Sequence, residues 1–365
     1  MKLKIIKMTS KFGNFFIAKI DGKRLEKLSR VDVRQLFNEH DSTGLQRKIF
    51  RAKVINIAEF IDTSYSIFPG SLILMVNRKV KFNILEDEIE INENEEKLFT
   101  ILDGQHRIAA FAESKNSFDV VVSIFHDLPQ FKMVELFKVV NTTQSPINPN
   151  LADELEVELP IMTPEKFSIL VIKRLNYDVN SPFHNKIKMY GEMNEDYQNP
   201  KTLSLHQFHI ELVDKLYRSV KYYHTLKDIL FTSDSFESSI EKIENIILPN
   251  EKKYIFWKYY KIESIERTCN IINTYFSVIS DLLPIDWNSD DSLIFKTVGF
   301  RALMRILEDT YEYAIKIRSF KYDDIYKLLE PLKKIDGTLN SEVYKGSSYS
   351  LATYIYNDLY KLIKW

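Results

Sequence analysis

The sequence has a single cysteine, Cys269, and only nine glycines among its 365 residues. One cysteine excludes an intramolecular disulfide and any zinc site built from several thiolates. No apolar run approaches the roughly 18 residues that a membrane span needs. Residues 1–10 alternate lysines with apolar residues, unlike the apolar core of a signal peptide. We therefore expect a protein of the reducing cytoplasm without a membrane segment.

Apolar residues make up 45% of the chain and charged residues 28%, which is typical of a folded protein and excludes a disordered or collagen-like chain. The net charge is −1, so the molecule as a whole is not a polycation. The charge is nevertheless uneven, because residues 1–60 hold 14 Lys and Arg against 6 Asp and Glu. Only this N-terminal part could present a basic face to nucleic acid.

The chain predicts two parts of different secondary structure. In the first part, apolar runs of strand length alternate with helical patterns, and residues 3–7 and 15–20 indicate a hairpin. After residue 203 nearly every segment has helical spacing, including residues 254–283. We predict an α+β protein with a mixed α/β domain over residues 1–155 and an all-helical domain over residues 156–365. A polar, proline-rich linker is expected near residues 177–203.

Three local signals predict the ends of elements. The acidic residues 86–96 predict a solvated loop or hairpin tip. Thr163 followed by Pro164 predicts the start of a helix with Thr163 as its N-cap. The amphipathic helix over residues 131–140 is expected to end at Asn141, acting as a left-handed cap, although Asn141 and Gln144 could instead line a pocket and contact a base or ribose.

Side chains that could bind a ligand are concentrated after the apolar run at residues 98–102. Asp103, Gly104, Gln105, His106 and Arg107 occupy five consecutive positions before a helical pattern. At the start of a helix the first amides have no internal partners, and the helix dipole places about half a positive charge there. Gly104 permits close approach of a ligand, and Arg107 can grip an anionic oxygen. The pattern indicates a phosphate site; the alternative is an ordinary turn with Asp103 as N-cap.

The run LFTILDGQHRIAAF at residues 98–111 resembles the signature of the DGQHR-domain family, within the ParB/sulfiredoxin-like superfamily. Three further segments resemble the same family: GLQR at residues 44–47, FPGSLILM at residues 68–75 and FKVVNTTQ at residues 137–144. The family is best known through DndB, the regulatory component of DNA phosphorothioation clusters. A related protein, DpdB, belongs to 7-deazaguanine DNA-modification clusters.

The resemblance implies a ParB/sulfiredoxin-like fold for the first domain and a nucleotide or nucleic-acid site at the DGQHR turn. DpdB-like members are associated with ATP hydrolysis at this motif, so ATP is the expected nucleotide. Hydrolysis would also need a metal and an oriented water, and Asp103 is the candidate ligand for Mg²⁺. Asp103, Gln105 and His106 would then be the catalytic residues. The residues expected to bind nucleotide or phosphate are Gly104, Arg107, Gln46, Arg47, Asn141 and Gln144.

Three functions remain open at this point. The first is an NTPase of a DNA-modification or phage-defence system, and the alternative is a non-catalytic, DNA-binding regulator like DndB. The third is a ParB-like nuclease. The sequence contains no G-x-x-x-x-G-K-[ST] motif, so ATP hydrolysis would be unconventional, and only Asp103 is a convincing carboxylate for nuclease chemistry. The expected partners are DNA and other DNA-modification or defence proteins, and homo-oligomer formation is left open.

Histidines outside the DGQHR turn give weaker signals. His206 and His209 lie about one helical turn apart, which suits metal binding, but the apolar residues around them favour an ordinary packed helix. His184 lies in a loop-like stretch and is a candidate contact for substrate or DNA.

Overall fold

The computed structural model describes the whole chain except residues 1, 11, 37–41, 47–48, 78–79, 81, 92–96, 145–147, 190–202, 219, 233–241, 244–252 and 347–348. The chain divides into two compact units, Met1–Asn148 and Pro149–Trp365. The boundary that the sequence places at residue 155 falls on the first residue of the 3-10 helix η1 (Leu155–Glu158). Among the helices of the described residues, none combines the length and the apolarity that crossing a lipid bilayer would require.

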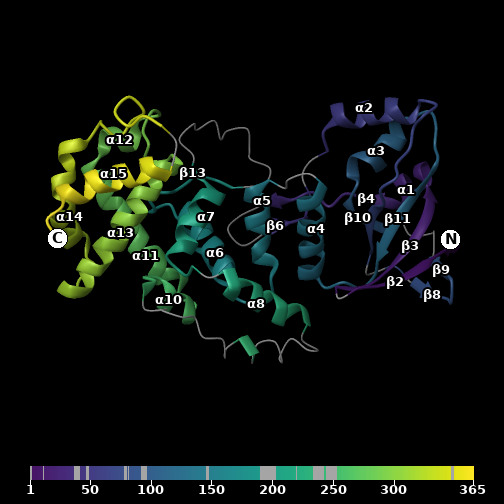
Figure 1. Cartoon of the computed structure of the whole chain (residues 1–365), viewed down its shortest axis with the longest axis horizontal. Helices are drawn as coiled ribbons and strands as arrows, with labels where there is room; N and C mark the ends of the chain where they lie inside the picture. Colours follow the sequence, from purple (N-terminus) through teal and green to yellow (C-terminus); the bar gives the residue numbers. More distant parts are fainter. Residues whose placement is uncertain are drawn as a thin grey trace. The chain divides into compact units, whose positions relative to one another are not determined.

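A six-stranded mixed sheet forms the centre of the first unit (Figure 1). Its strand order is β2-β3-β11-β7-β10-β4. β7 is parallel to β11 and β10 is parallel to β4, whereas the other neighbours are antiparallel. The strands are β2 (Ile6–Ser10), β3 (Gly13–Asp21), β4 (Ser29–Arg30), β7 (Leu72–Val76), β10 (Phe99–Asp103) and β11 (Asp119–Phe125).

Three helices pack on one face of this sheet: α1 (Gly22–Leu28), α2 (Arg51–Ile61) and α3 (Gln105–Glu113). Side chains alternate between the two faces of a strand, so residues paired across strands share a face. Val122 pairs with both Ala18 and Leu72, and all three are buried in the core that also contains Leu25 and Phe111 from the helices. Both α1 and α2 contact α3, which holds α3 in the middle of the helical layer.

Smaller elements complete the first unit. β1 (Lys2–Lys4), β9 (Glu88–Ile91) and β8 (Phe82–Ile84) form a separate antiparallel sheet, and β5 (Gln35–Leu36) pairs with β6 (Ser42–Thr43). The helix α4 (Gln130–Gln144) follows β11 in the chain and packs against β10.

The described part of the second unit is helical apart from one short parallel ladder between β12 (Ile187–Lys188) and β13 (Leu203–Ser204). Its core contains a cluster of aromatic rings in which Phe183, Phe208, Phe276 and Phe300 contact one another at centroid distances of 4.8–6.3 Å. The α+β class is confirmed. The helical segments are α5 (Pro149–Glu154), η1, α6 (Pro164–Tyr177), α7 (Leu205–Asp214), α8 (Val220–Thr232), α10 (Trp257–Lys261), α11 (Ile265–Leu282), α12 (Pro284–Asn288), α13 (Thr297–Ile317), α14 (Tyr322–Leu329), η3 (Glu330–Ile335) and α15 (Tyr349–Leu362).

The prediction of a solvated loop or hairpin tip over residues 86–96 is confirmed for residues 86 and 87, which are exposed at the turn between β8 and β9, and is wrong for residues 88–91. Residues 88–91 form β9, in which Ile89 and Ile91 are buried at 0% and 2% exposure. Glu90 lies on the other face and pairs with Lys2 of β1 at 2.5 Å. The high charge concealed an alternating pattern, because each glutamate occupies the outward position of a half-buried strand.

Two other predicted elements differ in the structure. Residues 3–7 do not pair with residues 15–20 as one strand, because β1 pairs with β9 and only β2 pairs with β3. The predicted helix over residues 254–283 is interrupted between α10 and α11, where Glu263 has a φ of 50°. This left-handed conformation cannot continue a right-handed helix, and no proline or glycine marks it in the sequence. Thr163 is confirmed as the N-cap of α6, with Oγ1 accepting from the Lys166 amide.

Candidate functional site

The predicted strand, turn and helix around residue 103 are confirmed. β10 ends at Asp103 and α3 begins at Gln105, so Gly104 is the N-cap of α3. Gly104 has a φ of 94°, and its missing side chain caps none of the first amides of α3. A Cβ at this position would lie 2.5 Å from Cδ2 of Leu72, so only glycine fits between the turn and β7. We call this junction, formed by Gly70 and residues 103–107, the β10–α3 corner.

An ion pair spans the corner. Nη2 of Arg107 donates to Oδ2 of Asp103 at 2.9 Å, and Nη1 of Arg107 donates to the carbonyl oxygen of Gly70 at 3.4 Å. The side chains of Arg107 and Asp103 are 23% and 18% exposed, so both reach solvent. The guanidinium therefore lies beside the first turn of α3, where the amides and the helix dipole also favour an anion.

His106 connects the start of α3 to the start of α2. The imidazole is 6% exposed, and its Nε2 accepts a hydrogen bond from the backbone amide of Phe50 at 3.1 Å. The Phe50 and His106 rings stack with an interplanar angle of 6°. Because Nε2 is an acceptor here, the neutral ring carries its proton on Nδ1. The arrangement gives His106 a structural role at the N-cap of α2.

The two glutamines at the corner are also buried. Gln105 is 7% exposed, and within the described residues its Oε1 has no hydrogen-bond partner. Gln46 is 2% exposed and donates from Nε2 to the carbonyl oxygen of Ile101 in β10. The structure thus places the Gln46 side chain against Ile101, which lies two residues before Asp103 in β10. Arg47 lies outside the described residues.

Asn141 does not end α4 as a left-handed cap, so this prediction is wrong. The helix continues to Gln144, and Nδ2 of Asn141 donates to the carbonyl oxygen of Phe137 at 2.8 Å, one turn earlier. The amide of Asn141 thereby competes with solvent for a helix carbonyl instead of closing the helix. The side chain of Gln144 lies outside the described residues.

Exposed cations lie on the two helices that pack against α3. Arg24 and Lys27 of α1 are exposed, as are Arg51 and Lys53 of α2. These side chains come from the basic segment of residues 1–60, and α3 lies between their two helices. The structure therefore places part of the N-terminal positive charge on the helical layer that holds the β10–α3 corner.

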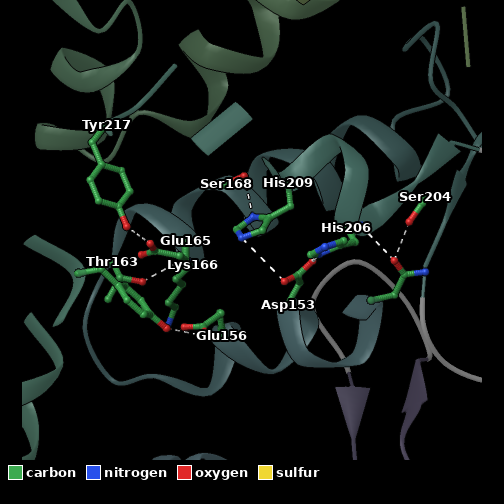
Figure 2. Close-up of polar contacts among 12 residues, drawn as sticks. Asp153, Glu156, Thr163, Glu165, Lys166, Ser168, Ser204, His206, His209 and Tyr217 are labelled. Atoms are coloured by element: carbon green, nitrogen blue, oxygen red, sulfur yellow. Dashed lines mark hydrogen bonds and ion pairs between the residues drawn. The ribbon is translucent and has the colours of Figure 1, made fainter. Parts of the chain in front are cut away.

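His206 and His209 both face one carboxylate in the second unit. Asp153 of α5 lies between them, with Oδ2 at 2.6 Å from Nδ1 of His206 and Oδ1 at 3.9 Å from Nε2 of His209 (Figure 2). Nδ1 of His209 is 3.1 Å from Oγ of Ser168. Across the described ranges, no group of three or more His, Cys, Asp or Glu side chains is arranged to hold a metal ion. The ring of His184 lies beside the side-chain amide of the next residue, with Nε2 at 3.0 Å from Nδ2 of Asn185.

A cavity of about 870 Å³ lies beside α7 and α13 in the second unit. Four of its charged lining residues form two ion pairs, Glu211 with Arg301 at 2.5 Å and Asp214 with Arg218. Burial raises the pKa of Glu211, and the hydrogen bond from Arg301 opposes this shift. The Glu211–Arg301 pair joins α7 to α13, and the Asp214–Arg218 pair joins α7 to the residues that follow it.

Sequence reasoning did not identify two backbone groups that shape the corner. The Gly70 carbonyl holds Arg107, and the Phe50 amide holds His106. The Phe-Pro-Gly segment at residues 68–70 belongs to one of the segments that resemble the DGQHR-domain family, but no side-chain pattern signals that a carbonyl points toward an arginine 37 residues later.

A comparison with protein-family models matches residues 5–153 to the family described as DndB, DNA-sulfur modification-associated. The match covers the whole sheet, the β10–α3 corner and α4, and it ends within α5. Comparisons with curated proteins and with solved structures gave no significant match.

Proposed function

Because residues 5–153 match the family described as DndB, DNA-sulfur modification-associated, we propose that this protein is a DNA-binding, non-catalytic component of DNA phosphorothioation. The observation that carries the proposal is the β10–α3 corner, in which Arg107 lies beside the uncapped first turn of α3. We further propose that a backbone phosphate of DNA binds there.

The chemistry of the corner suits a phosphate. Gly104 leaves the first amides of α3 without a side-chain cap, and such amides donate readily to anionic oxygens. Arg107 adds a guanidinium that can bind two oxygens of one phosphate. Arg24 and Lys27 of α1 and Arg51 and Lys53 of α2 are exposed on the two helices that pack against α3, and we expect them to contact further phosphates along a duplex.

The burial of the polar side chains supports a binding role over hydrolysis. A general base must be within reach of the attacking water and have a free lone pair. Nε2 of His106 is engaged by the Phe50 amide, and both His106 and Gln105 are less than 8% exposed. Asp103 is the remaining candidate, and its carboxylate already accepts from Arg107.

Nucleotide binding with slow ATP hydrolysis is the second candidate, and the uncapped start of α3 favours it equally well. The two functions are separated by measuring duplex binding and phosphate release on the same samples. We expect Arg107→Gln to weaken binding of a labelled 20-base-pair duplex by roughly five- to tenfold, because it removes one charge-assisted phosphate contact. Fluorescence anisotropy at 100 mM salt measures this change.

Lys4→Gln is the matched control, because Lys4 is exposed on β1, in the separate three-stranded sheet. Equal duplex affinity of wild type and Arg107→Gln would show that DNA does not use the corner. Release of phosphate from ATP by the wild type, lost in folded Asp103→Asn, would replace the proposal by the NTPase.

A further inference from the structure

The guanidinium at the corner is already occupied by groups of the protein itself. Its two terminal nitrogens bind different acceptors, Nη2 the Asp103 carboxylate at 2.9 Å and Nη1 the Gly70 carbonyl at 3.4 Å. Asp103 is the last residue of β10 and precedes the N-cap, so its negative charge lies next to the positive end of α3. An incoming phosphate would compete with Asp103 for the guanidinium of Arg107.

The negative charge of Asp103 makes the corner a poor binding site for small anions. Asp103 cancels the formal charge of Arg107, and both side chains are largely withdrawn from solvent, at 18% and 23% exposure. Reduced exposure weakens the screening of like charges, so a second anion near Asp103 is repelled. The corner with its ion pair closed therefore has little net attraction for an isolated phosphate.

A duplex brings further contacts that a small anion lacks. We expect its neighbouring phosphates to contact the exposed cations of α2 and α1 (Arg51, Lys53, Arg24 and Lys27), and each contact adds favourable free energy. These contacts can compensate for the displacement of Asp103 from Arg107, in the way that remote contacts of a ligand offset local costs.

We propose that Asp103 is an internal competitor for Arg107 that determines the class of ligand at the corner: it excludes free phosphate and mononucleotides and admits the DNA backbone. This inference rests on the proposed function, because it concerns the same site. It assigns Asp103 a role opposite to that of a metal-holding or catalytic carboxylate.

The test compares full-length wild type with Asp103→Asn, which keeps the shape of the side chain and removes its charge. Titration calorimetry with inorganic phosphate and with ATP, each with and without Mg²⁺, should show no saturable binding to wild type at millimolar ligand. Asp103→Asn should bind both with or without the metal. Anisotropy should show a duplex affinity higher by roughly three- to tenfold, the effect of one lost ion pair of partial burial.

Two further variants keep the outcome interpretable. Asp103→Ser should behave like Asp103→Asn, and melting curves of both variants establish that they are folded. Adding Arg107→Gln to Asp103→Asn should abolish the gain, because the released guanidinium is then absent. The inference would be overturned if folded Asp103→Asn bound phosphate, ATP and duplex no more tightly than wild type. It would also be overturned if the wild type bound ATP in a Mg²⁺-dependent way and Asp103→Asn lost this binding. The proposed function fails separately, if wild type binds no duplex or if Arg107→Gln binds it equally well.

Discussion

At the scale of single residues, a glycine is needed where two backbone segments come into close contact. Gly44 has a φ of 78°, and a Cβ there would lie 2.0 Å from the carbonyl oxygen of Val33. Val33 forms a bridge with Gln46, whose amide group binds the Ile101 carbonyl in β10. Gly44 therefore lets residues 44–46 approach the strand that carries Asp103.

We expect Gly44→Ala to lower the free energy of unfolding by about 3 kcal/mol or more, because left-handed strain and a backbone clash act together. Gly337→Ala is the matched control, since Gly337 has a φ of 83° but its Cβ would meet only the Ile285 side chain at 3.3 Å. The control should lose about 1–2 kcal/mol, the cost of the backbone conformation alone. Urea unfolding followed by circular dichroism measures both; equal losses would exclude a role for the close approach.

The burial of His106 and Gln105 shows how far residue types can predict a site. The pattern DGQHR correctly marks a junction at which the chain turns from strand to helix. It does not distinguish side chains that face solvent from those that face the core. His106 is directed to the Phe50 amide because α2 packs beside α3, and that packing joins residues 56 positions apart.

At the scale of elements, side-chain caps join helices that are distant in sequence. Asp62 follows the last residue of α2 and accepts hydrogen bonds from the Ser114 hydroxyl and from the amides of Lys115 and Asn116, just after α3. The hydrogen bond from Ser114 has the largest effect in lowering the pKa of Asp62, and the amide hydrogen bonds lower this pKa further. The ends of α2 and α3 are thereby held together at the side of the layer away from the corner.

The lowered pKa gives a dependence of stability on pH. A carboxyl whose pKa is lower in the folded state stabilises the fold above its unfolded-state pKa, and this contribution disappears as pH falls through the folded-state value. We expect Asp62→Asn to melt at a lower temperature than wild type at pH 7 and the difference to vanish in acid. Glu59→Gln, on the exposed side of α2, is the control. If the difference in melting temperature persisted unchanged at pH 2, the ionised carboxylate of Asp62 would not be the source of the stabilisation.

The elements also show where periodicity succeeds and where it fails. Buried strands such as β10 and amphipathic helices such as α6 have clear patterns, so their positions follow from the sequence. β9 is hidden by its glutamates, and the break before α11 depends on one residue, Glu263, in a left-handed conformation. The strand β9 and the break before α11 depend on the residues that pack against these segments, and a local sequence pattern does not contain that information.

At the scale of the whole molecule, positive charge is concentrated in residues 1–60, and the rest of the chain is acidic overall. The structure places Arg24, Lys27, Arg51 and Lys53 of this segment on the helices beside α3. A duplex bound there would release counterions roughly in proportion to the phosphates contacted.

We expect the logarithm of the duplex affinity to fall linearly with the logarithm of salt concentration, with a slope of about −3 to −5 for these four cations and Arg107. Reversing the charge of Arg24 and Arg51 together should reduce the slope by about 2. Reversing Lys327 and Lys334, on α14 and η3 of the second unit, is the matched control. An unchanged slope in the Arg24 and Arg51 variant would place the duplex elsewhere on the molecule.

The sequence alone determined the α+β class, the strand–turn–helix around Gly104 and the resemblance that the family match supports, because each depends on neighbouring residues or on a contiguous pattern. Only the tertiary structure decided which polar side chains meet. It brought Gln46 to β10, turned His106 toward Phe50 and placed the Gly70 carbonyl against Arg107. Side chains separated by tens of residues come into contact only when a core orders the elements between them, so their partners cannot be derived from local spacing.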